Sequence, residues 1–208
     1  MLRPFTLLTL SATGLATGLI TSPDVAPARQ TEIAQSVAEV SALRDEIGKA
    51  ASATAVLDRW CVSHHMAPEG AVIAEKIANK PVPATAQLRR TLQLKASDRV
   101  QLRHVRLRCS GHILSVARLW YVPSRLPASM EVSLQQTGTP FGKVVAPMHL
   151  DRKSAGSSSA WLPKGERRTA KIPPLILFSQ RALMSRADGL PIAYVVEDYQ
   201  RGLLGFAP

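Results

Sequence analysis

Hydrophobic residues recur every three or four positions in the segment after residue 30. Ile33, Val37, Val40, Leu43 and Ile47 are spaced by four, three, three and four residues. This spacing places all five side chains on one face of an amphipathic helix. The pattern therefore predicts an N-terminal helix that packs its apolar face against the rest of the protein.

The chemistry of the flanking residues sets the expected limits of two helices. Thr31 can cap the first helix with its hydroxyl, and Gly48 weakens the helix near its other end. A second helical stretch begins near Val56, and Pro68 and Gly70 would end it. One side of that stretch carries Val56, Leu57, Trp60, Cys61 and His64.

The pattern changes to a period of two between residues 99 and 109. Four of these residues fall on one face of the predicted strand: Arg103, Val105, Leu107 and Cys109. The other face carries His104, Arg106 and Arg108. Strict alternation indicates a half-buried β-strand, and the turn signal at 110–111 leads into a second strand over 113–122. The sequence therefore predicts a central β-hairpin.

The rest of the chain also favours hairpins. We expect strands over 71–77, 144–150, 175–186 and 191–199, a short helix over 128–136, and loops over 79–83 and 153–171. Residues 84–94 are compatible with either helix or strand. Asp188-Gly189 between two apolar runs is a strong hairpin signal. Helices followed by hairpins predict an α+β fold with an antiparallel sheet and helices on one side.

The first residues resemble a leader segment. Arg3 precedes an uncharged, apolar or small stretch from Phe5 to Ile20, and Ala26-Pro27-Ala28 offers a cleavage site. This is typical of a secretory signal peptide over residues 1–28, and an uncleaved membrane anchor is the alternative. We therefore expect an exported protein, periplasmic or secreted. A helical segment over 29–69 and an α+β domain over 70–208 would follow the leader.

The charge of the chain bears on the kind of partner that it could bind. The chain has 26 Lys and Arg against 15 Asp and Glu, a formal net charge of +11. Such a balance favours anionic partners, and a solvated basic surface explains it equally well. The sequence has no Walker loop, GxSxG, HExxH or dinucleotide-binding glycine pattern. We therefore do not expect a P-loop nucleotide-binding protein, an α/β-hydrolase, a zinc peptidase of the HExxH type or a dinucleotide-binding enzyme.

The two cysteines raise the question of a disulfide. In an exported protein Cys61 and Cys109 would pair, which would tie an early helix to the central sheet. Two buried thiols are the alternative. His64 and His65 lie close to Cys61 but lack a convincing second pair of ligands, so we expect no metal site.

Two charged residues fall at positions predicted to be buried. Arg103 shares its strand face with apolar residues, and a buried guanidinium needs a partner or an anionic ligand. Glu197 follows an apolar run in the last strand, where burial would disfavour its charged form. A structural role for each, including a mutual Arg–Glu pair, is the competing interpretation. Backbone N–H groups near the bend at 138–142 could also meet ligand oxygens.

These features occur in an order that resembles chorismate pyruvate-lyase. The similarity covers roughly residues 70–200. It rests on LRHVRL at 102–107, the turn at Gly111, YVP at 121–123, LQQTGTPFG at 134–142, and the last hairpin from Gly189 to Glu197. The resemblance implies a six-stranded antiparallel sheet flanked by helices, with the ligand enclosed between them. Ligand-binding domains of some bacterial transcription regulators share this fold.

The resemblance also implies a reaction and the residues that perform it. The family converts chorismate to 4-hydroxybenzoate and pyruvate without metal or organic cofactor. Arg103 resembles the arginine that holds the ring carboxylate, and Glu197 the glutamate at the ring hydroxyl. Phe141, next to Gly142, occupies the place of a backbone N–H that contacts the ligand.

Two hypotheses therefore follow from the sequence. The first is a lyase that cleaves chorismate or a related enolpyruvyl carboxylate, with catalytic Arg103 and Glu197. The second is an exported, non-catalytic binding protein for a small aromatic carboxylate. We expect no nucleic-acid partner, while contact with an anionic surface stays open.

Overall fold

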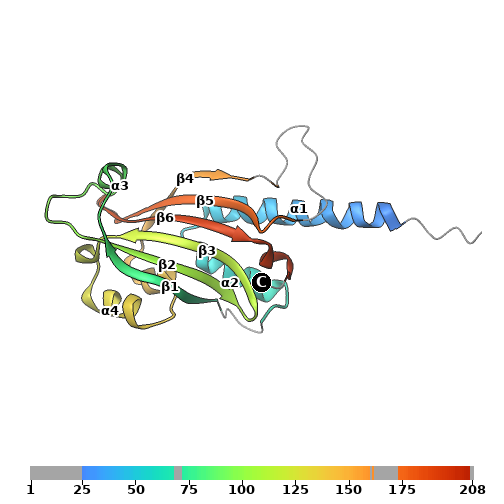
Figure 1. The fold of residues 1–208 in the computed structure, drawn as a ribbon, viewed down its shortest axis with the longest axis horizontal. Coiled ribbons are helices and arrows are strands. Elements are labelled where there is room, and N and C mark those ends of the chain that lie inside the picture. The colour runs from blue at the N-terminus through green and yellow to red at the C-terminus, as the bar shows by residue number, and fades with distance from the viewer. Residues whose placement is uncertain (1–24, 68–71, 160, 162–172, 207–208) are drawn as a thin grey trace, which may run out of the picture.

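Six antiparallel strands form one sheet in the order β1-β2-β3-β6-β5-β4 (Figure 1). The computed structural model describes residues 25–67, 72–159, 161 and 173–206, with side chains from residue 31 onward. The strands are β1 (Ile73–Val82), β2 (Val100–Cys109), β3 (His112–Tyr121), β4 (Asp151–Ser158), β5 (Ile176–Ser185) and β6 (Pro191–Gln200). The predicted α+β fold with a six-stranded antiparallel sheet flanked by helices is confirmed.

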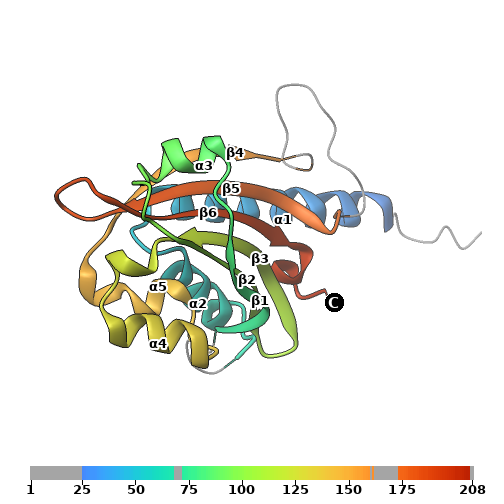
Figure 2. The same ribbon diagram turned by 60° about the vertical axis from the view of Figure 1, so that its left-hand side comes forward.

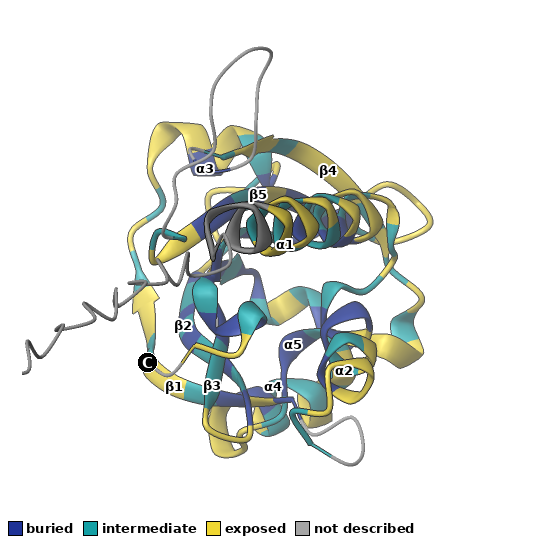
Figure 3. Cartoon of the chain, turned by 90° about the vertical axis from the view of Figure 1, so that its right-hand side faces the viewer, coloured by how far each residue is buried: buried dark blue, intermediate teal, exposed yellow. Residues whose placement is uncertain are grey.

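Helices α1, α2, α4 and α5 lie on the concave side of the curved sheet (Figures 2 and 3). The α-helices are α1 (Val25–Lys49), α2 (Ala53–Ser63), α3 (Ala86–Thr91), α4 (Ala128–Gln136) and α5 (Phe141–Val144). Three short 3-10 helices are η1 (Pro123–Arg125), η2 (Ala146–Met148) and η3 (Arg201–Leu204). The concave side holds the main core, in which Leu43 of α1 and Leu57 of α2 pack with residues of the sheet.

Alternation along the strands divides the sheet into two faces of different character. On β2, Val105, Leu107 and Cys109 are buried, while His104 and Arg106 between them are partly exposed. We call the buried side the inner face and the opposite, convex side the outer face. Among the described residues, a small second cluster packs on the outer face, around Leu88 of α3 and Leu92 just after it.

The structure confirms both central hairpins, β2–β3 and β5–β6, and the helix over 128–136. Four local predictions are wrong. The first helix begins at Val25 and not at Thr31, and the predicted strand over 144–150 contains η2, where Pro147 favours a helical turn.

The other two errors concern the edges of the sheet. The predicted loop over 79–83 continues β1, because an edge strand tolerates Pro81. The first part of the predicted polar loop over 153–171 belongs to β4, and residues 162–172 lie outside the described residues. The β4 edge strand is mostly exposed on both sides, so its sequence lacks the alternation that marks β2. The expected leader, residues 1–28, lies almost wholly outside the described residues.

Candidate functional site

A cavity of about 350 Å³ lies between the inner face of the sheet, α2, and the segment from α5 to β4. Its walls are largely apolar, and five charged side chains complete the lining. The apolar lining includes Val105, Leu107, Ala117, Leu119, Val145, Met184 and Val195. The charged lining consists of Asp58, Arg103, Lys143, Arg152 and Glu197, with His149 nearby in the wall.

Arg103 lies on the inner face of β2 and is 1% exposed. Its guanidinium donates hydrogen bonds to the carbonyl oxygens of Leu134, Thr137 and Thr139. The Nε atom is buried without a hydrogen-bond partner, and among the described residues no carboxylate lies within ion-pair distance of Arg103. Burial lowers the pKa of the guanidinium, and the nearby Tyr121 and Glu131 oppose that effect. Arg103 is therefore a buried cation balanced mainly by backbone dipoles.

The end of α4 explains why backbone carbonyls surround this arginine. The last carbonyls of a helix have no partner inside the helix, and Leu134 belongs to the last turn of α4. The chain then turns through 137–140 into α5, which brings the carbonyl of Thr139 back toward β2. Arg103 thus anchors the α4–α5 connection to the sheet while it lines the cavity.

Glu197 lies on the inner face of β6 and is 5% exposed. Ser115 Oγ donates a hydrogen bond of 2.5 Å to one carboxyl oxygen, and Tyr199 OH donates one of 2.9 Å to the other. Burial raises the pKa of this carboxyl group, although the two hydrogen bonds and the charge of Arg152 act in the opposite direction. The group is therefore more easily protonated than an exposed glutamate.

The strand register places Arg103 and Glu197 on the same side of the sheet without contact between them. Arg103 pairs with Leu119 of β3, whereas Glu197 pairs with Ala117. Two strand spacings and two residue steps separate their Cα atoms by roughly 12 Å. No ion pair joins them among the described residues, so the mutual Arg–Glu pair considered from the sequence is not formed. Both line one cavity from opposite ends of a diagonal.

Phe141 and Gly142 form the start of α5 and also line the cavity. The Phe141 ring is 9% exposed and lies 5.9 Å from the ring of Tyr121. A Cβ atom on Gly142 would lie 3.0 Å from both Ser52 Oγ and Thr54 Oγ1. The glycine therefore allows α5 to approach the N-terminus of α2 closely.

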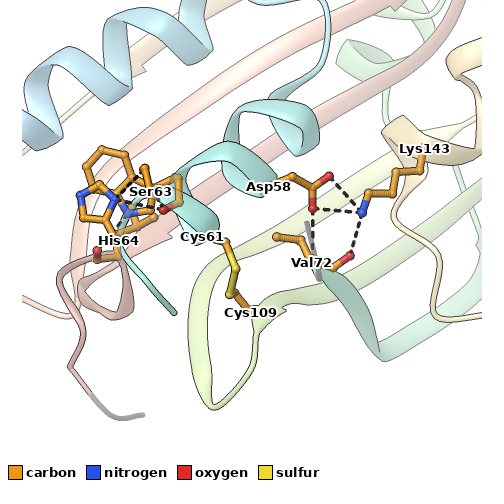
Figure 4. Close-up of a disulfide and its surroundings, with 9 residues drawn as sticks. Asp58, Cys61, Ser63, His64, Val72, Cys109 and Lys143 are labelled. Carbon is orange, nitrogen blue, oxygen red and sulfur yellow. Dashed lines mark hydrogen bonds and ion pairs between the residues drawn. A yellow bond between two sulfur atoms is a disulfide. The ribbon is translucent and has the colours of Figure 1, made fainter. Parts of the chain in front are cut away.

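Several residues of the cavity escaped the sequence analysis. Arg152 of β4 donates a 2.6 Å hydrogen bond to the carbonyl of Ile47 at the end of α1. Lys143 of α5 forms a 3.0 Å ion pair with Asp58 of α2, so two elements of the cavity wall are joined (Figure 4). The sequence analysis also missed Ser115 and Tyr199, the two partners of Glu197, although strand alternation places both on the same face as Glu197.

Cys61 of α2 and Cys109 of β2 form a disulfide (Figure 4). Both residues are fully buried, and their Cα atoms lie 6.2 Å apart. The bond attaches α2 to the inner face of the sheet. Within the described residues, no group of three or more His, Cys, Asp or Glu side chains could hold a metal ion. No described helix is long and apolar enough to cross a membrane.

Comparison with solved structures returns bacterial transcription regulators at low identity. A GntR-family regulator from Bacillus cereus matches with 13% identity and a TM-score of 0.43 over 62% of this chain and 91% of that chain. The effector domain of PhnF from Mycobacterium smegmatis matches with 12% identity and a TM-score of 0.46, over 62% and 81% of the two chains. Because the sequence identities and TM-scores are this low, the function must be argued from the residues of the chain itself.

Comparison of sequences gives a nearer relative. No protein-family model matches the chain. The uncharacterized protein y4mC of Sinorhizobium fredii is 34% identical, over 83% of this chain and 78% of its own length. The chain therefore belongs to the same protein family as y4mC of Sinorhizobium fredii.

Proposed function

We propose that this protein binds a small aromatic carboxylate in the cavity between the inner face of the sheet and helices α2 and α5. The observation that carries the proposal is Arg103, a buried cation on the cavity wall with no carboxylate within ion-pair distance among the described residues. A buried charge of this kind is stabilised by an anion that enters the cavity. The guanidinium has an unpartnered Nε–H to offer such an anion.

The remaining walls favour an aromatic ring between two polar ends. Val105, Leu119 and Val195 form an apolar surface on the three central strands, and about 350 Å³ is within the range of small-molecule sites. Glu197, on the far diagonal of the cavity, has a raised pKa and can donate a hydrogen bond when protonated or accept one when ionised. A carboxylate at one end and a hydroxyl at the other, as in 4-hydroxybenzoate, match this arrangement.

The test is a calorimetric titration of the protein with 4-hydroxybenzoate and with benzoate. Arg103→Met should weaken binding of both acids by about 100-fold, because a charge-assisted contact with a buried guanidinium is lost. Arg106→Met is the matched control, since it removes one cation from the outer face of the same strand. Glu197→Gln should weaken the binding of 4-hydroxybenzoate more than the binding of benzoate. Equal affinity of the Arg103→Met variant and the unaltered protein would reject the site.

A lyase activity is the second candidate, favoured by the presence of a raised-pKa carboxyl group in the same cavity as Arg103. Cleavage of chorismate breaks the ether C–O bond and removes the ring proton on the carbon that bears the hydroxyl, which converts the ring to 4-hydroxybenzoate. The enolpyruvate that leaves takes up one proton at its methylene carbon and becomes pyruvate. Arg103 would hold the ring carboxylate, and Glu197 would assist proton movement at the ether or hydroxyl oxygen.

Incubation with chorismate separates the two candidates. Release of 4-hydroxybenzoate by the unaltered protein and not by Arg103→Met would support the lyase. Retained binding of 4-hydroxybenzoate without any product from chorismate would support the binding protein. Both candidates fail together if neither compound binds.

We further propose that the protein acts outside the cytoplasm. The leader pattern in residues 1–28 supports export, and so does the Cys61–Cys109 disulfide, because such bonds persist in oxidising compartments. Export can be tested by expressing a C-terminally tagged chain in bacteria. Cell fractionation then locates the protein, and mass spectrometry shows its N-terminus and the state of its cysteines. We expect a periplasmic protein cleaved near Ala28 with no free thiol. An intact N-terminus in the membrane fraction would indicate the anchor, and a reduced, uncleaved cytoplasmic protein would contradict export.

A further inference from the structure

The outer face of the sheet carries a concentration of cations that the cavity does not use. Register places these residues in rows across the strands, so that His104, Arg118 and Arg181 lie side by side with Val196 between the two arginines. We call the following outer-face residues the cationic face: Lys80, Arg106, Arg108, Arg118, Lys153 and Arg181. They come from five of the six strands, and none faces the cavity.

These side chains are open to solvent, in contrast to their neighbours on the inner face. The Arg106 side chain is 40% exposed and that of Arg118 is 48% exposed, while Arg103 on the same sheet is 1% exposed. Lys80, Lys153 and Arg181 are also exposed. Within the described part of the chain, α3 is the helix that packs on this face, and it covers only the end near Trp120 and Tyr194. The centre of the face is therefore uncovered by any described helix.

Acidic residues on the same face neutralise only part of its charge. Glu75 binds both Arg106 and Arg108, at 2.8 and 2.9 Å, and Asp198 lies 3.5 Å from Arg118. Asp151 is the third acid at an outward position. Six arginines and lysines thus oppose three carboxylates, and Arg89 and Arg90 of α3 add two exposed cations at the border. The face keeps a positive charge where its centre is open.

We propose that the cationic face docks onto the anionic headgroups of a phospholipid bilayer. Clustered lysines and arginines attract such a surface, and a broad sheet face can meet several headgroups at once. A second copy of this chain is a poor occupant, because two such faces would bring an excess of like charges together. The proposal does not depend on the ligand in the cavity, which lies on the opposite side of the sheet.

A nucleic acid fits this face less well than a lipid surface. Sheets that bind single-stranded nucleic acids present exposed aromatic rings on which bases stack. Here the rings of Trp120 and Tyr194 are stacked on each other and pack in the cluster beneath α3. At the centre, Val196 lies between Arg118 and Arg181, and Val116 lies between Arg106 and Asp198; neither valine offers a stacking surface.

Vesicle sedimentation with the full chain tests the proposal. We expect binding to vesicles of phosphatidylcholine mixed with phosphatidylglycerol that weakens as salt is added. Vesicles of phosphatidylcholine alone measure any contribution of the apolar leader. Replacing Arg118 and Arg181 together by Ser should weaken the salt-sensitive binding roughly 10- to 30-fold, as expected for two cations close to a charged membrane.

The control variant replaces Arg44 and Arg59 by Ser on helices α1 and α2, which removes the same charge from the other side of the molecule. Its binding should stay within about twofold of the unaltered protein, because charges farther away than a Debye length are screened. Thermal melts of both variants show that they are folded. Equal weakening in the two variants, absence of binding to the anionic vesicles, or tighter binding to an oligonucleotide at the same salt concentration would each overturn the proposal.

Discussion

The two faces of the central sheet carry the same residue types in opposite surroundings. On β2, Arg103 is 1% exposed and donates hydrogen bonds only to backbone carbonyls, whereas the side chain of Arg106 is 40% exposed and pairs with Glu75. The two arginines are three positions apart, so they point to opposite faces. The alternation of side chains along the strand therefore decides whether an arginine is a solvated charge or a buried cation on a cavity wall.

The carboxylates follow the same division. Glu197 on the inner face receives hydrogen bonds from two neutral hydroxyls, and burial raises its pKa. Glu75 on the outer face lies between two arginines, whose hydrogen bonds lower its pKa. The inner face thus surrounds each charge with neutral dipoles, while the outer face joins opposite charges. Only the first arrangement leaves a buried charge without an opposite charge beside it on the wall of the cavity.

The largest expected effect concerns the disulfide on the inner face. Cys61 and Cys109 are 48 residues apart, and chain-entropy arguments assign a bond of that loop length about 4 kcal/mol of stability. Replacing both cysteines by Ser should lower the free energy of unfolding by about that amount, measured by urea denaturation. Reduction of the unaltered protein should have a similar effect. An unchanged unfolding midpoint would show that α2 does not need the bond to stay on the sheet.

The second comparison removes one arginine from each face. Arg103→Met removes a buried donor from the carbonyls of Leu134, Thr137 and Thr139, and unpaired buried acceptors are costly. The Leu134 carbonyl keeps a hydrogen bond from Asn79 Nδ2. We expect a loss of about 2 kcal/mol in the free energy of unfolding, after the gain from removing a buried charge is counted. Arg106→Met should cost less than about 1 kcal/mol, as exposed ion pairs usually do. Equal losses in denaturant melts would contradict the division between the faces.

The third comparison uses pH, because the two carboxyl groups shift in opposite directions. The raised pKa of Glu197 means that the folded protein keeps a proton that the unfolded chain releases above about pH 4.3, so this group reduces stability as pH rises toward its folded pKa. The lowered pKa of Glu75 has the opposite consequence: its contribution is present above the unfolded pKa and is lost as pH falls.

Denaturant melts of Glu197→Gln and Glu75→Gln from acid to neutral pH measure this difference. The stability of the unaltered protein relative to Glu197→Gln should fall as pH rises, with a slope of at most about 1.4 kcal/mol per pH unit for one proton. Its stability relative to Glu75→Gln should rise with pH. Parallel pH profiles for the two variants would show that both carboxyl groups have the same surroundings.

The inner face could be predicted from sequence where strand alternation was visible. The period of two on β2 predicted that Arg103 shares a face with Val105 and Leu107, and the apolar run of β6 drew attention to Glu197. Arg152 was missed because β4 is an edge strand exposed on both sides, so no alternation marks its single inward arginine. The carbonyls around Arg103 belong to the backbone, and their convergence depends on how α4 ends, which side chains do not reveal.

The smallest effect concerns the glycine that lets α5 approach α2. Gly142→Ala would place a Cβ atom 3.0 Å from Ser52 Oγ and Thr54 Oγ1, so the two helices must move apart slightly. We expect a loss of less than about 1 kcal/mol in the free energy of unfolding, because a small shift relieves such overlap. Affinity for 4-hydroxybenzoate should fall about threefold, since both helices form the cavity wall and positioning is coupled to their spacing.

Gly111→Ala supplies the matched control for this change. Gly111 lies in the β2–β3 turn, where an added Cβ meets no atom within 4 Å, and its φ is not positive. Replacement there restricts the unfolded chain without strain, so stability should stay equal or rise by up to about 1 kcal/mol, with ligand affinity unchanged. If Gly142→Ala behaved like Gly111→Ala in both melts and titrations, the contact between α5 and α2 would not shape the cavity. The ligand would then be positioned by the sheet alone, through Arg103 and Glu197.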